Sequence, residues 1–264
     1  MLFDTHAHVN FKAFHENWKA VLDNCQKNSI WLTNVGSQYE TSKKAVELAE
    51  KYEKGVYATI GIHPVHAHTV DFDAKKFTTL IRSNKGKVVG VGETGIDFWH
   101  NTDHFDIQKE VFIKHIELAV EYDQALVIHG RNDKEGKISC YDEITKILRR
   151  FQKLPRAVVH CFGGNSEEAK KFLDLGLFIG FTGIITFKNA QYLQNIAQNI
   201  VPIDQLLIET DSPYLSPHPF RGKENKPQNV EFVCKKIAEL KEKDYNEVEL
   251  LTFQNALKLY NIKN

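Results

Sequence analysis

The chain has 264 residues, and its 34 Lys and Arg balance 34 Asp and Glu, so the formal net charge is zero. A neutral chain argues against broad, non-specific wrapping of nucleic acid, which needs a strongly basic face, but permits a pocket that binds a few phosphates. Four scattered cysteines without a CxxC pair are typical of a reduced, cytoplasmic protein. We expect no signal peptide and no membrane-spanning segment.

Short apolar and β-branched runs alternate with amphipathic stretches along the chain. The runs predict strands over residues 2–5, 30–35, 56–62, 88–92, 125–128, 157–160, 177–181 and 206–208. Helical periodicity between them predicts helices such as 41–52, 108–121, 141–151 and 167–175. Capping boxes are expected at Ser37 with Glu40 and at Asn165 with Glu168.

This alternation predicts a parallel sheet. Eight strand–helix repeats within this length favour the α/β class and a (β/α)8 TIM barrel over an open doubly wound sheet. The first strand also lacks the G-x-G-x-x-G motif of a dinucleotide-binding fold. No linker marks a boundary, so we expect a single domain over residues 1–264, with one or two extra helices after Pro227.

The first predicted strand ends in the motif His6-Ala-His8. Alternate side chains of a strand point to one face, so both imidazoles are expected to project together, with Asp4 on the same side. Two adjacent imidazoles are either a surface accident or half of a metal site, and the other strand ends must decide between these alternatives.

Catalytic groups of a (β/α)8 barrel lie at the carboxyl ends of the strands. Imidazole or carboxylate side chains recur at these ends: His6 and His8, His63, Glu93 and Asp97, His129, His160, and Glu209 and Asp211. A single histidine after a strand is a weak signal. Because independent accidents would not fall at the same end of successive strands, the whole set predicts a metal centre.

With these motifs the sequence resembles the TatD-type metal-dependent deoxyribonucleases, a branch of the amidohydrolase-like barrels. The segments that carry the resemblance include F-D-T-H-A-H, G-I-H-P, V-G-E-T-G-I-D-F, V-I-H-G-R, V-V-H-C-F-G-G, L-L-I-E-T-D-S-P-Y-L and P-F-R-G-K-E-N-K-P. They run from residue 3 to residue 227 in the family's order. H-x-H alone is shared by all amidohydrolases, whereas E-T-D-S-P-Y-L together with R-G-K is highly specific.

The resemblance implies two divalent cations. Six side chains would hold them: His6, His8 and Asp211 on the first, His129 and His160 on the second, and Glu93 bridging both. The family is described as magnesium-dependent, whereas four histidines favour zinc, manganese or iron. We expect Mg²⁺, Mn²⁺ or Zn²⁺.

Two cations can activate a water and clamp a phosphodiester. We expect Asp211 to take the proton from this water. Glu209, on the same strand face, is the second choice or an orienting carboxylate. His63 is expected to contact phosphate or the leaving group rather than to be a further ligand.

Arg131 and Arg221 are predicted to bind phosphate oxygens, for which a guanidinium is well suited. The aromatic residues Phe98, Trp99 and Tyr214 follow the motifs and either stack on a base or pack at the barrel rim. The fifth strand continues H-G-R-N-D where the family often has H-S-R-D-A. This departure removes no ligand but leaves substrate contacts open.

The resemblance favours a cytoplasmic exonuclease that acts on single-stranded or end-containing DNA, in repair or degradation, as a monomer without an obligate protein partner. The main alternative is an amidohydrolase for a small amide, lactone or phosphoester. A basic R-G-K loop suits phosphates better than a neutral amide. The third alternative, a non-catalytic metal-binding barrel, is disfavoured by the complete set of ligands.

Overall fold

A computed structural model describes residues 1–84, 86–100 and 102–263. Eight parallel strands form one sheet in sequence order. They are β1 Leu2–Ala7, β2 Ile30–Val35, β3 Val56–Ile60, β4 Val88–Asp97, β5 Ala125–Arg131, β6 Ala157–Val159, β7 Phe178–Phe181 and β8 Leu206–Ile208. The segment after β8 joins β1, because the Asp211 amide donates to the His6 carbonyl and the His8 amide to the Ser212 carbonyl, both at 2.8 Å.

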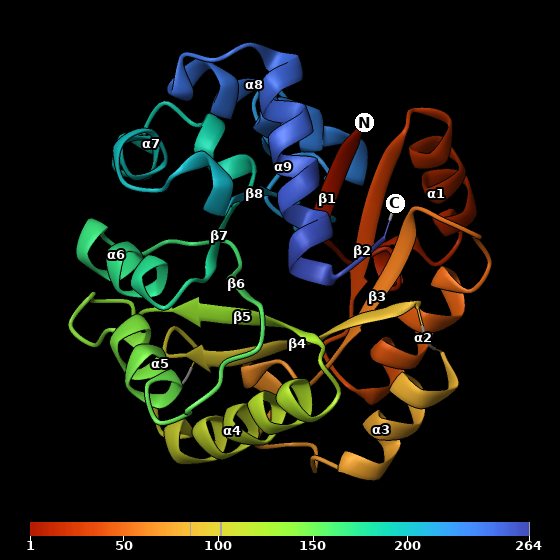
Figure 1. The fold of residues 1–264 in the computed structure, drawn as a ribbon, viewed down its shortest axis with the longest axis vertical. Helices are drawn as coiled ribbons and strands as arrows, with labels where there is room; N and C mark the ends of the chain where they lie inside the picture. Colours follow the sequence, from red (N-terminus) through yellow and green to blue (C-terminus); the bar gives the residue numbers. More distant parts are fainter. Residues whose placement is uncertain (85, 101, 264) are drawn as a thin grey trace.

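Helices surround these strands (Figure 1). They are α1 Trp18–Lys27, α2 Tyr39–Ala49, α3 Ala74–Ser83, α4 Phe105–Glu121, α5 Cys140–Leu148, α6 Ser166–Asp174, α7 Gln191–Asn199, α8 Val230–Lys241 and α9 Tyr245–Tyr260. The architecture confirms the predicted (β/α)8 TIM barrel with additional helices after Pro227. No helix among the described residues is long and apolar enough to cross a membrane.

Three strands extend further at their carboxyl ends than the sequence pattern predicts. β1 reaches Ala7, β4 reaches Asp97 and β5 reaches Arg131. The pattern stops early because glycines and polar side chains interrupt the apolar runs. These polar ends are nevertheless paired, with Gly95 opposite His129 and Asp97 opposite Arg131. Several candidate site residues therefore lie within the sheet, which is a more rigid support than a loop.

Of the two predicted capping boxes, the second is confirmed. The Asn165 side chain accepts from the amides of Glu167 and Glu168, while Glu168 accepts from the Asn165 amide at 2.7 Å. The first is wrong: α2 is capped at Gln38, whose amide donates to the Thr41 hydroxyl. That hydroxyl occupies the place expected for the Glu40 carboxylate.

Aromatic and aliphatic side chains from the beginnings of all eight strands fill the barrel interior. They form one buried cluster with residues of α9: Phe3, Trp31, Tyr57, Val89, Ala125, Val127, Val158, Phe178, Leu207, Phe253, Ala256, Leu259 and Tyr260. Helix α9 lies beside β1 (Figure 1), and the Tyr260 hydroxyl donates to the Thr5 carbonyl at 2.8 Å. The amino end of the barrel is therefore closed, and only the carboxyl end is left for chemistry.

Candidate metal centre

A β-bulge in β1 turns both histidines of the H-A-H motif into the barrel. Between Asp4 and Ala7 the register shifts, so that three residue steps on β1 pass two on β2. An extra residue in a strand reverses the alternation of side chains beyond it. His6 and His8 converge after the bulge, with their Nε2 atoms 3.2 Å apart. The predicted convergence of the two imidazoles is confirmed.

The prediction that Asp4 shares their face is wrong, because Asp4 precedes the bulge. Its carboxylate is fully buried and accepts from the Thr210 amide and hydroxyl at 2.8 and 2.6 Å. Thr5 is the residue before the bulge that reaches toward the centre, since its hydroxyl donates to the Glu209 carboxylate at 3.3 Å. Asp4 thus joins β1 to the segment after β8 instead of offering a ligand.

Asp211 completes the first group of candidate ligands. Its Oδ1 lies 3.2 Å from His8 Nε2 and 3.8 Å from His6 Nε2. Asp211 lies three residues after the end of β8 and has a positive φ of 55°, which aspartate tolerates better than most residues. The second ring nitrogen of His8 faces the Val35 carbonyl at 2.9 Å, so Nε2 is the atom left to ligate.

Glu93 lies between two sets of histidines and presents one oxygen to each. Oε2 is 3.5 Å from His6 Nε2 and 3.9 Å from His8 Nε2. Oε1 is 2.8 Å from His129 Nδ1 and 3.2 Å from His160 Nε2. This is the arrangement that a bridging carboxylate needs. A divalent cation on each side of this carboxylate would be bound by one of its oxygens and by the imidazole nitrogens that face that oxygen.

Glycines on both sides of Glu93 allow β4 to approach β5 closely. Gly92 and Gly95 have φ values of 134° and 147°, which favour glycine. A Cβ atom at Gly95 would collide with the His129 carbonyl oxygen. A Cβ atom at Gly92 would lie 2.5 Å from the Val127 carbonyl oxygen. The G-E-T-G motif thereby brings the carboxylate and the next strand's histidine together.

Asp97, which sequence reasoning placed at a strand end without a role, orients His129. Its Oδ2 faces His129 Nε2 at 3.0 Å, and its side chain is 1% exposed. Nδ1 of His129 is therefore the nitrogen left to bind a cation. The signal was available: Asp97 is four residues after Glu93 in one strand and so lies on the same face.

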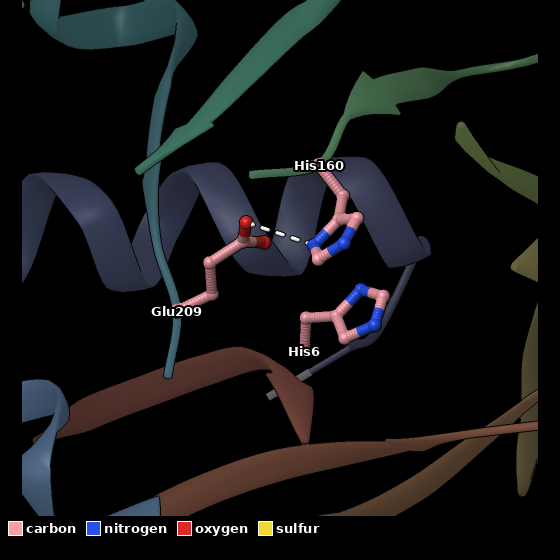
Figure 2. Close-up of side chains that lie close together, drawn as sticks. All are labelled: His6, His160 and Glu209. Carbon is pink, nitrogen blue, oxygen red and sulfur yellow. Dashed lines mark hydrogen bonds and ion pairs between the residues drawn. The ribbon is translucent and has the colours of Figure 1, made fainter. Parts of the chain in front are cut away.

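Glu209 has the matching position behind His160 (Figure 2). Its Oε1 accepts from His160 Nδ1 at 3.0 Å and from the Cys161 amide at 2.5 Å, and its side chain is 1% exposed. Nε2 of His160 is thus left to face Glu93. Since Asp211 is 16% exposed, the geometry favours Asp211 as proton acceptor and an orienting role for Glu209.

His63 lies closer to the centre than a substrate contact requires. Its Nε2 is 3.2 Å from His129 Nδ1 and 3.5 Å from Glu93 Oε1. These atoms form one of three groups in the described chain that could hold a cation. The other two groups are His6, His8 and Glu93, and His6, His160 and Glu209. The interpretation of His63 as a phosphate contact stays a prediction.

The histidines keep both candidate carboxylate ligands ionised. Burial alone would raise the pKa of Glu93, but the imidazoles of His63, His160 and His6 outweigh it and hold this pKa well below its usual range. Burial also opposes ionisation of Asp211, yet the His8 hydrogen bond and the charge of His160 lower its pKa. Deprotonated carboxylates beside imidazoles fit a divalent cation.

Basic and aromatic side chains pair at the mouth of the barrel. The Arg131 guanidinium lies 4.4 Å from the Trp99 ring centre, and that of Arg221 lies 4.5 Å from the Phe187 ring centre. Neither arginine forms an ion pair with a described residue. Phe98 is buried and packs on Phe105. Of the two alternatives for this residue, packing at the barrel rim therefore holds and base stacking does not.

A (β/α)8 barrel with imidazoles and carboxylates converging at its carboxyl end is typical of metal-dependent hydrolases. A sequence profile described as TatD related DNase matches residues 3–261. The chain belongs to this family.

Relatives agree with this assignment. The chain is 36% identical to the uncharacterized metal-dependent hydrolase YabD of Bacillus subtilis, over 99% of this chain and 100% of the relative. It is 33% identical to the uncharacterized metal-dependent hydrolase YcfH of Escherichia coli, over 99% and 96%. The crystal structure of YJJV, a TatD homolog from Escherichia coli, superposes with a TM-score of 0.89 at 27% identity, over 99% and 98%.

Proposed function

We propose that this hydrolase cleaves phosphodiester bonds of DNA with two divalent cations, acting on single-stranded or end-containing substrates. The observation that carries the proposal is Glu93, whose two oxygens face two separate groups of imidazoles. A carboxylate that served one cation would not need a second set of nitrogens on its other oxygen. Mg²⁺, Mn²⁺ and Zn²⁺ are all compatible with these donors.

Two cations in such a site supply an activated water and neutralise charge on the phosphodiester. The chain's own residues do the remaining work. Asp211 is ionised and the more exposed of the two candidate bases, so it accepts the proton of the attacking water. His63 contacts the phosphate or the leaving oxygen. Asp97 and Glu209 keep two ligands in the required tautomer and orientation.

The barrel mouth supports a polyanionic substrate. Arg131 and Arg221 lie outside the ring of ligands with no competing carboxylate among the described residues, so they are available to bind phosphate oxygens. A small neutral amide would leave both guanidinium groups unused. Four free thiols agree with a cytoplasmic location.

The test is hydrolysis by the purified, metal-loaded protein of a labelled single-stranded oligonucleotide, compared with a panel of amides and lactones. We expect oligonucleotide cleavage with Mg²⁺ or Mn²⁺ that stops on chelation. Turnover of an amide or lactone without cleavage of any oligonucleotide would overturn the proposal in favour of an amidohydrolase.

A further inference from the structure

A pocket beside the metal centre is lined by side chains that the proposed mechanism does not use. Its volume is about 290 Å³, close to the lower end of the usual range for small-molecule sites. It lies between the segment that follows β1 and the helices α1 and α2. Its lining includes Asn10, Phe11, Lys12, His15, Trp18 and Lys44.

Only one aromatic ring separates this pocket from the candidate ligands. The Phe11 ring stacks on the imidazole of His8, with ring centres 4.2 Å apart and planes 19° from parallel. The side-chain Nδ2 of Asn10 donates to the Val35 carbonyl at 3.0 Å, and His8 Nδ1 faces the same oxygen. The pocket therefore shares a wall with the candidate metal centre, through Phe11 and His8.

The lining combines positive charge with flat apolar surface. The described lining holds no acidic side chain, and neither Lys12 nor His15 forms an ion pair with a described residue. Lys44 lies 3.5 Å from the Glu47 carboxylate, on the exposed side of α2. Phe11 and Trp18 contribute aromatic surface. The buried Oδ1 of Asn10 has no hydrogen-bond partner among the described residues, which leaves one unsatisfied polar atom in the wall of the pocket.

We propose that this pocket, named here the Trp18 pocket, binds one nucleotide of the substrate strand adjacent to the cleaved bond. Lys12 and Lys44 contact its phosphate, and the rings of Phe11 and Trp18 contact its base. The inference rests on the proposed function, because it assigns the pocket to the same polynucleotide substrate.

Binding in the presence of a chelator tests the Trp18 pocket apart from catalysis. Calorimetry with the full chain would compare a dinucleotide with a hexanucleotide. The variants are Lys12→Ala/Lys44→Ala and Trp18→Ala, and the control Lys235→Ala/Lys258→Ala removes the same charge from α8 and α9. We expect the hexanucleotide to bind more tightly than the dinucleotide. Each pocket variant should lower hexanucleotide affinity about 5- to 100-fold, while the control changes it less than about twofold.

Equal affinities of the pocket variants, the control and the unmodified chain for the hexanucleotide would overturn the inference, even if DNA is cleaved. Because Lys12 and Lys44 are surface side chains, their variant stays informative if Trp18→Ala does not fold. Mononucleotide, nucleoside and inorganic phosphate are separate probes. Phosphate binding as tight as that of the mononucleotide would reduce the pocket to an anion site and contradict the proposal. Mononucleotide binding without any DNA cleavage would support the pocket while overturning the proposed nuclease function.

Discussion

Replacing Asp97 by Asn tests whether metal affinity depends on the carboxylate that orients the candidate ligand His129. The variant keeps the shape of the side chain and leaves a neutral acceptor 3.0 Å from His129 Nε2. What it removes is the negative charge, which is buried with 1% of the side chain exposed. Such outer partners of a ligating histidine typically contribute about 10- to 100-fold to metal affinity or activity, or about 1.4 to 2.7 kcal/mol.

The assay is calorimetric titration of metal-free protein with Mn²⁺ or Zn²⁺. We expect Asp97→Asn to weaken one binding step by this factor and to leave the other unchanged, because Asp97 contacts His129 and none of His6, His8 or Asp211 among the described residues. Glu168→Gln is the matched control, since its buried carboxylate caps α6 instead. Thermal unfolding would confirm that both variants fold. Unchanged affinity at both steps, with the fold intact, would refute the orienting role of Asp97.

Three further predictions concern the same region. Glu93→Gln should lower metal affinity by more than about 100-fold, because both candidate groups lose a ligand. Metal at 100 times Kd should stabilise the unmodified chain by about 2.7 kcal/mol, and the variant should lose this stabilisation. Calorimetry would check the affinity, and thermal unfolding with and without metal would check the stability. His63→Ala should lower the rate of oligonucleotide hydrolysis while metal affinity stays within about threefold; a parallel loss of affinity would make His63 a ligand. His115 is fully buried, and burial lowers its pKa from 6.5 to about 4, so its contribution to stability is complete above pH 6.5 and lost as the pH falls toward 4. The loss is about 3 kcal/mol, and denaturant unfolding of His115→Gln should show a correspondingly smaller decrease over this pH interval.

The strand ends could be predicted from the sequence because a parallel barrel gathers them at one rim. His6, His8, Glu93, His129, His160 and Asp211 all lie within the connected set of contacts around Glu93. The exact residue at which each strand ends was harder to predict. Apolar periodicity fades where candidate ligands replace core residues. β4 therefore runs five residues beyond the predicted end at residue 92.

Side-chain direction was the feature that pattern reasoning could not supply. Strict alternation placed Asp4 with the histidines, but the bulge that separates them has no signature in L-F-D-T-H-A-H. The Thr210 amide and hydroxyl that satisfy Asp4 come from 206 residues away. Similarly, the choice between Asp211 and Glu209 as the general base depends on which side chain is exposed. Only the folded barrel defines that exposure.

The closing helix α9 also sets the order in which this barrel can be completed. Phe3 and Trp31 belong to the first strands to leave the ribosome, yet their partners Phe253 and Tyr260 follow every strand. During synthesis the lumen therefore stays open at its amino end, with aromatic surface uncovered, until residues 245–260 have emerged. Nascent chains that stall before α9 would expose that surface to chaperones or to one another, although all six candidate metal ligands would already have been synthesised.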